Sequence, residues 1–213
     1  MIYERVDSTE PIRQGDIFKN VPRVDFILSA LAIIDGDDSL KETNWREALL
    51  SKNSGDPISA VLAVIPVTAI VMTQNCDAVR GESLSLCQID DYLVATGQQS
   101  VPKDAKAWQS LLVRTARTNN RFFYLPEGPD FGFEGNMAAD LRVVLRVARQ
   151  DLEQMRDQRV ARLNPTARDH FRECLGHFFR RYAYNEWYPL TVEELRHYAA
   201  KSAEPIDPFE WQK

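Results

Sequence analysis

The sequence predicts a mixed α+β protein, and three observations carry that prediction. A continuous apolar run, residues 67–72, has the length and composition of a buried strand. Residues 83–89 and 139–147 alternate apolar and polar side chains with the period of two that is typical of half-buried strands. Asn164 followed by Pro165 predicts the start of a helix, because asparagine caps free backbone N–H groups and proline fits the first helical position.

Length and composition are those of a single globular domain, residues 1–213, with a formal net charge of −5. No apolar run approaches the ~20 residues that span a bilayer, and the first ten residues are charged rather than apolar, unlike a secretory signal. The three cysteines are an odd number without pairing-like spacing. We therefore expect a cytoplasmic protein with free thiols and no membrane association.

The first half of the chain is predicted to contain strands and one helical insertion. A strand segment spans residues 14–22, and the apolar residues 23–34 favour a second strand over a buried helix. Residues 40–52 have helical spacing and are predicted to be an insertion. Residues 58–92 contain two strand segments interrupted at Pro66, followed by a hairpin whose tip lies at residues 75–82.

The second half is predicted to complete the sheet and then form helices. Residues 102–118 place their apolar side chains on one helical face, which indicates a second insertion. Residues 121–147 contain an aromatic strand, a glycine-rich loop and a long alternating strand. Residues 165–201 are predicted to hold the C-terminal helices, the first reaching about Tyr182 and the second beginning at a capping box at Thr191.

The order of several segments resembles the PemK/MazF-type toxin family, whose fold is an SH3-like β-barrel with a C-terminal helix. The resemblance is carried by QGDIF at residues 14–18, AIVMTQ at residues 69–74, SLSLCQI at residues 83–89, ADLRVVLRV at residues 139–147 and the helix after RLNP at residues 162–165. It covers about half of the chain. The resemblance implies an SH3-like barrel with helical insertions and a C-terminal helical cap.

The same resemblance implies metal-free cleavage of single-stranded RNA, but the family's catalytic residues are not matched. Its arginine before the second strand falls at Ile65-Pro66-Val67, and its polar residue near the end of the third strand falls at Gln88, Ile89 and Asp90. The sequence therefore predicts a barrel that lacks the nuclease.

A polar cluster follows the apolar run and is the first candidate for catalysis. It consists of Thr73, Gln74, Cys76, Asp77 and Arg80. A cysteine beside polar groups and an arginine can act as a nucleophile if a histidine base reaches it. The only histidines, His170, His177 and His197, lie in the predicted C-terminal helices. The alternative, a structural cysteine with Asp77 capping a turn, is the more common situation.

His170, Cys174 and His177 share neighbouring parts of one helical face and form a second candidate set. With Cys76 or Cys87 as a fourth ligand they would suit tetrahedral zinc. The closely spaced ligand pairs of structural zinc sites are missing, so we predict no metal and no other cofactor.

An arginine-rich stretch offers a third candidate, a surface for single-stranded nucleic acid. The arginines are Arg142, Arg146, Arg149, Arg156, Arg159 and Arg162, and the nearby rings are Phe122, Phe123 and Tyr124. Arginines beside exposed rings bind phosphates and stack bases. Solvated arginines and core aromatics explain the same residues, and the acidic total argues against a general nucleic-acid binder.

These observations predict a non-catalytic or diverged RNA- or protein-binding module of a bacterial toxin or defence system. An active endoribonuclease of the PemK/MazF type and a hydrolase centred on Cys76 are the alternatives. The expected partners are a protein or single-stranded RNA, and a homodimer is compatible with the sequence.

Overall fold

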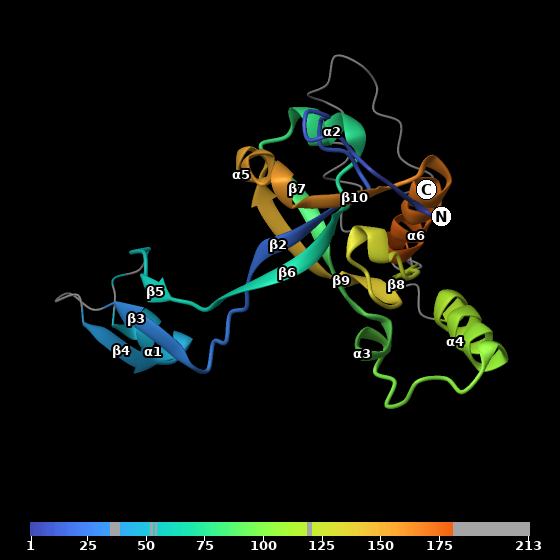
Figure 1. Cartoon of the computed structure of the whole chain (residues 1–213). Coiled ribbons are helices and arrows are strands. Elements are labelled where there is room, and N and C mark those ends of the chain that lie inside the picture. The colour runs from blue at the N-terminus through green and yellow to red at the C-terminus, as the bar shows by residue number, and fades with distance from the viewer. Residues whose placement is uncertain (35–38, 52, 54, 119–120, 181–213) are drawn as a thin grey trace, which may run out of the picture. The chain divides into compact units, whose positions relative to one another are not determined.

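The computed structural model describes residues 1–180 except 35–38, 52, 54 and 119–120 (Figure 1). The chain divides into two compact units, Met1–Phe178 and Phe179–Lys213. The predicted helix beginning at Thr191 lies outside the described residues. No helix in the described part of the chain is long and apolar enough to cross a membrane.

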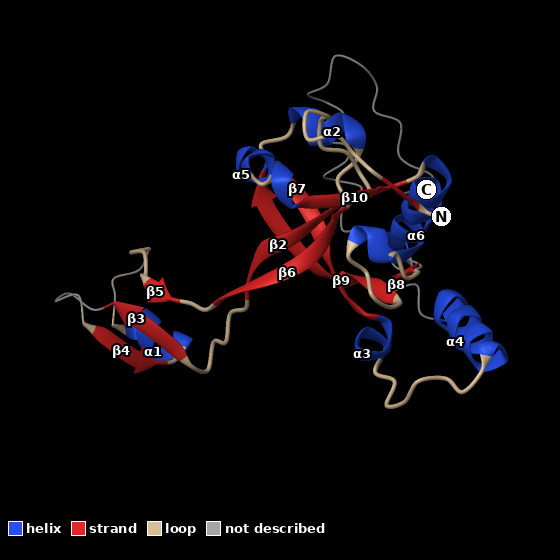
Figure 2. Ribbon diagram, in the orientation of Figure 1, coloured by secondary structure: helices blue, strands red, loops and turns tan. Residues whose placement is uncertain are grey.

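The first unit is built on a seven-stranded sheet in which every neighbouring pair is antiparallel (Figure 2). In spatial order its strands are β1 Tyr3–Glu4, β10 Arg159–Leu163, β2 Asp16–Val24, β6 Val64–Val71, β7 Ser83–Asp91, β9 Met137–Ala148 and β8 Phe122–Leu125. The predicted α+β class is confirmed. Strands β1 and β8 are the two edges, so the described ladder is open.

A second, three-stranded sheet lies between β2 and β6 in the chain. Its spatial order is β4 Leu40–Thr43, β3 Leu31–Ile34 and β5 Ala60–Val61, and the helix α1 Trp45–Leu50 follows β4. Two predictions need correction in their bounds. Residues 23–34 contain strand rather than helix, as expected, but residues 25–30 separate the end of β2 from β3. The predicted helix 40–52 begins as a strand, β4, and only α1, capped by Asn44, is helical.

Both faces of the large sheet are buried, because successive residues of one strand point to opposite sides. On β2, Ile17 belongs to one apolar cluster and Phe18 to another. The helix α6 Pro165–Arg180 contributes Phe171, Leu175 and Phe178 to the first cluster. The helices α2 Asn75–Arg80 and α5 Arg149–Gln154 contribute Ala78 and Leu152 to the second.

Pro66 does not interrupt the strand, since β6 runs through it opposite Pro22. The hairpin of residues 71–89 is confirmed, but its tip contains α2. The predicted helix 102–118 is α4 Ala105–Thr118. The strand β10 and the helix α5 were not predicted. Short helices α3 Tyr92–Thr96, η1 Pro129–Phe131 and η2 Arg156–Gln158 complete the described elements.

Candidate functional site: a polar row across the sheet

One face of the large sheet carries a row of polar and aromatic side chains across three neighbouring strands. Gln88 on β7 pairs with Asp140 on β9, and Asp140 pairs with Phe122 on β8. Directly paired residues of antiparallel strands point to the same face, so the three side chains lie side by side. Gln88 and Asp140 are only 6% and 5% exposed. Two polar side chains buried together in a sheet need partners, and arginines supply them.

Arg142 occupies one end of this row in a fixed orientation. Its Nε and one terminal nitrogen donate to the two carboxylate oxygens of Asp140 at 2.9 and 2.7 Å. Its guanidinium carbon lies 5.1 Å from the centre of the Phe122 ring, a cation–π arrangement. The hydrogen bonds to Asp140 raise the pKa of Arg142. The Arg142 side chain nevertheless remains 44% exposed, so a positioned positive charge faces solvent.

Arg23 occupies the other end of the row. It donates to Oε1 of Gln88 at 2.6 Å and forms a two-point ion pair with Asp25 at 2.7 and 2.6 Å. The amide nitrogen of Gln88 in turn donates to the Asp90 carboxylate at 2.9 and 2.8 Å. The Arg23 side chain is 26% exposed. We call Arg23, Gln88, Asp140, Arg142 and Phe122 the polar row.

Arg159 and Arg162 have a different environment, in the interior. Both pair with Asp16, whose side chain is fully buried, and their own side chains are 1% and 6% exposed. Arg159 also donates to the backbone carbonyls of Asp7, Glu10 and Pro11. Apart from the buried Nε of Arg159, the donors of these guanidiniums are bound within the chain and hold the N-terminal segment against the sheet. Arg159, predicted as a nucleic-acid ligand, is therefore poorly placed to reach a phosphate.

The other predicted arginines lie near the surface and make local contacts. Arg146 on β9 donates to the Ser83 hydroxyl at 2.8 Å. Arg149 donates to the Gly81 carbonyl at 3.0 Å and pairs with Glu153. Arg156 donates to the carbonyls of Ser8 and Thr9. Only Arg142 among the predicted arginines combines a fixed orientation with a neighbouring aromatic ring.

The predicted cysteine cluster lies at the start of α2. The Thr73 hydroxyl accepts the Ser85 N–H at 2.7 Å, and Gln74 is the residue before the helix, without a side-chain cap. Cys76, Asp77 and Arg80 are exposed on α2. Gln14 connects α2 with α6. Its backbone N–H donates to the Asn75 side chain on α2, and its side-chain Oε1 accepts from Arg172 on α6.

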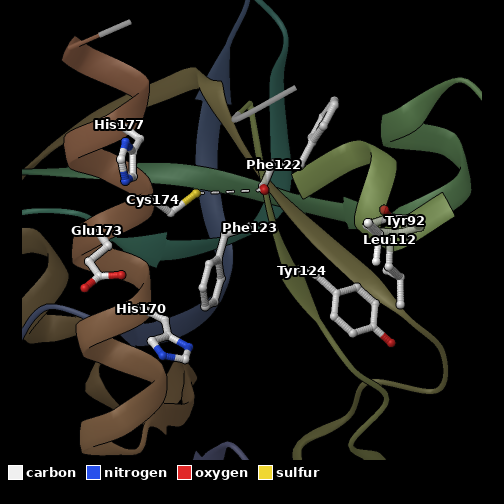
Figure 3. Close-up of a pocket in the computed structure, with 10 residues that line it drawn as sticks. Tyr92, Leu112, Phe122, Phe123, Tyr124, His170, Glu173, Cys174 and His177 are labelled. Carbon is white, nitrogen blue, oxygen red and sulfur yellow. Dashed lines mark hydrogen bonds between the residues drawn. The ribbon is translucent and has the colours of Figure 1, made fainter. Parts of the chain in front are cut away.

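The histidines line a different region from Cys76. His170 and His177 belong to a pocket of about 470 Å³ beside β8, together with Cys174 and Glu173 (Figure 3). Arg172, which reaches Gln14, is two residues from His170, so these two side chains leave α6 in different directions. No contact in the described part of the chain joins a histidine to Cys76.

The three cysteines are free, and two of them are sheltered. Burial raises the pKa of Cys174 to about 11, and burial also raises the pKa of Cys87. Within the described residues, no group of three or more His, Cys, Asp or Glu side chains is arranged to hold a metal. The set His170, Cys174 and His177 therefore lines a pocket wall without forming a metal site.

Comparisons of the chain with protein-family models, with curated proteins and with solved structures found no match. The case for the polar row therefore rests on its geometry. Arg142 and Phe122 were identified in the sequence, whereas Arg23 and Asp140 were missed. A signal was present, since Gln88 and Asp140 are polar residues inside strands whose neighbours are mostly apolar.

Proposed function

We propose that the protein is a non-catalytic, single-stranded RNA-binding module with a diverged PemK/MazF-like, SH3-like barrel, acting in a bacterial toxin or defence system. The main support for this proposal is the position of the Arg142 guanidinium. Asp140 holds this guanidinium over the Phe122 ring, and the Arg142 side chain remains exposed to solvent. A phosphate can bind the free edge of such a guanidinium, and an adjacent base can stack on aromatic or guanidinium faces.

The barrel assignment draws support from the strand order and the register shifts. Strands β2, β6, β7 and β9 are consecutive antiparallel neighbours, and the ladders shift register between Phe18 and Val21 and between Cys87 and Gln88. Such bulges bend strands and increase twist, as closing a small barrel requires. Arg23 lies opposite Ile65, the position at which the family's catalytic arginine is missing. Because Arg23 is bound to Asp25 and Gln88, we do not propose it as a replacement for that arginine.

We propose that the polar row does not catalyse a reaction, because each of its charged side chains is held in an ion pair. Arg23 and Arg142 are each bound to an aspartate, and the polar row contains no histidine. The alternatives, an active endoribonuclease and a hydrolase using Cys76, predict turnover that a binding module lacks. Free thiols fit a reducing, cytoplasmic environment.

Fluorescence anisotropy with a labelled ten-nucleotide single-stranded RNA of mixed sequence tests the proposal. Arg142→Lys keeps the charge but loses the two-point geometry and the flat stacking surface, and we expect about a tenfold loss of affinity. Arg46→Lys, at an exposed position of α1, is the matched control and should bind like the wild type. Affinity should fall steeply with salt, and the RNA should remain intact.

Equal binding by the wild type and Arg142→Lys would contradict the proposed site. Undetectable binding by the wild type would contradict the function. Cleaved RNA would replace the binding module with the endoribonuclease alternative.

A further inference from the structure

The outer edge of β8 presents backbone N–H and C=O groups that no described strand pairs with. Strand β8 is last in the sheet, and among the described strands only β9 pairs with it. The Arg121 carbonyl accepts the Leu141 N–H at 2.9 Å, so odd-numbered residues bond toward β9. Because this pattern alternates along an antiparallel strand, Phe122 and Tyr124 direct their backbone N–H and C=O groups outward.

A groove lies along that outer edge. On one side is α6, with His170, Glu173, Cys174 and His177, and on the other are Tyr92 and the α4 residue Leu112 (Figure 3). Val113 of α4 also lines the groove. The Cys174 thiol, a weak donor, approaches the Phe122 carbonyl at 3.9 Å. At about 470 Å³ the groove is within the size range of ligand-binding pockets. A sheet edge between two helices thus faces an apolar groove.

The charge of the groove selects the kind of occupant. Glu173 is the only formally charged residue at pH 7 among the lining residues, and no described cation pairs with it. The Glu173 carboxylate in the wall repels phosphates, so nucleic acid is a poor occupant. A peptide strand supplies alternating N–H and C=O groups that match an exposed edge, and its lysine or arginine can pair with Glu173.

We propose that this groove binds an extended peptide of a partner protein, which adds to the sheet as a strand beside β8. The peptide carries apolar side chains at alternate positions, directed into the groove, and a basic residue that faces Glu173. About four residues of the peptide lie along Phe122–Leu125. This site goes beyond RNA binding and overlaps the polar row at one residue, Phe122, whose ring contacts Arg142 and lines the groove.

Selection from a phage-displayed library of random octapeptides, with the full chain as target, is the experiment. We expect enriched peptides with alternating apolar residues and a Lys or Arg. Val113 is 43% exposed, so Val113→Asp should leave the fold intact, place a charge in the groove and weaken the selected peptides at least tenfold. Val79→Asp, on α2 at 59% exposure, is the matched control and should bind normally.

Two chemical tests then separate strand addition from general apolar adhesion. N-methylation of alternate peptide nitrogens should abolish binding in one register and be tolerated in the other, because a strand uses only one of its edges against β8. Glu173→Gln should weaken the basic peptide and leave unchanged a version in which glutamine replaces the basic residue.

Three outcomes would overturn the inference. The first is that the wild type enriches no peptides beyond those that Val113→Asp enriches. The second is that peptides N-methylated in either register bind equally well. The third is that an eight-nucleotide RNA displaces the selected peptide from the Arg142→Lys variant. The last result would assign the groove to nucleic acid. Because RNA binding is measured separately through Arg142, failure here leaves the proposed function standing.

Discussion

Two arginine–aspartate clusters on the same sheet differ in what remains free after the ion pairs form. In the interior cluster, Asp16 pairs with Arg159 and Arg162, and backbone carbonyls take most of the remaining donors. In the polar row, Asp140 holds Arg142 while that side chain stays 44% exposed. The same residue types thus fasten the N-terminal segment in one place and present a fixed charge in the other. An arginine's role depends on the acceptors around it more than on the local charge of the sequence.

The largest expected effect is on the interior cluster. Asp16→Asn removes the charge that Arg159 and Arg162 share and leaves the buried Arg159 without a carboxylate partner, while Arg162 keeps Glu10. An uncompensated buried charge costs about 3–5 kcal/mol. We expect the free energy of unfolding, measured in urea, to fall by that amount. Asp157→Asn, an exposed aspartate of η2, is the control and should change stability little. A loss as small as that of the control would mean that the cluster does not fasten the fold.

Removing the carboxylate of the polar row should have a smaller effect on stability and should also weaken RNA binding. Asp140→Asn keeps the shape and one hydrogen-bond acceptor for Arg142 but removes the charge that orients it. We expect a stability loss of about 1–3 kcal/mol together with weaker single-stranded RNA binding in the anisotropy assay. If binding is unchanged while stability falls, Asp140 is a structural residue only and the contrast with Asp16 disappears.

The smallest effect concerns pH at the margin of the interior cluster. The hydrogen bond from Arg162 lowers the pKa of Glu10 below its ordinary value of 4.5. A lowered pKa means that the ionised Glu10 stabilises the fold above pH 4.5 and that this contribution is lost as the pH falls below it. The stability difference between wild type and Glu10→Gln should therefore shrink from pH 7 to pH 3.

Glu4→Gln, an exposed glutamate of β1, serves as the comparison for that pH series. Equal pH dependence in Glu10→Gln and wild type would show that the pair with Arg162 contributes nothing measurable to folding.

The elements that the sequence predicted well are those with strong local signals. Asn164 accepts the Ala167 N–H at 2.8 Å, as the helix start required, and α4 and the hairpin were placed correctly. The strand β10 was missed because its residues RVARL include two arginines, which resemble a solvated segment until Asp16 is placed beside them.

The candidate site was predictable only in part, for a related reason. Arg142 and Phe122 were named because arginines and rings occur together in that part of the sequence. The contact of Arg23 with Gln88 joins positions 65 residues apart on strands that are not neighbours. Such a contact follows from the register and coiling of the whole sheet, which no local pattern specifies.

The central claim, that the two arginine clusters differ in their access to ligand, is tested most directly by NMR of the arginine side chains. The side-chain Nε–H signals would be followed while a ten-nucleotide single-stranded RNA is added to ¹⁵N-labelled full-length protein. We predict that the Arg142 signal shifts with the RNA concentration and that the signals of Arg159 and Arg162 stay in place. An unmoved Arg142 signal, or shifts of Arg159 and Arg162 equal to it, would contradict the account.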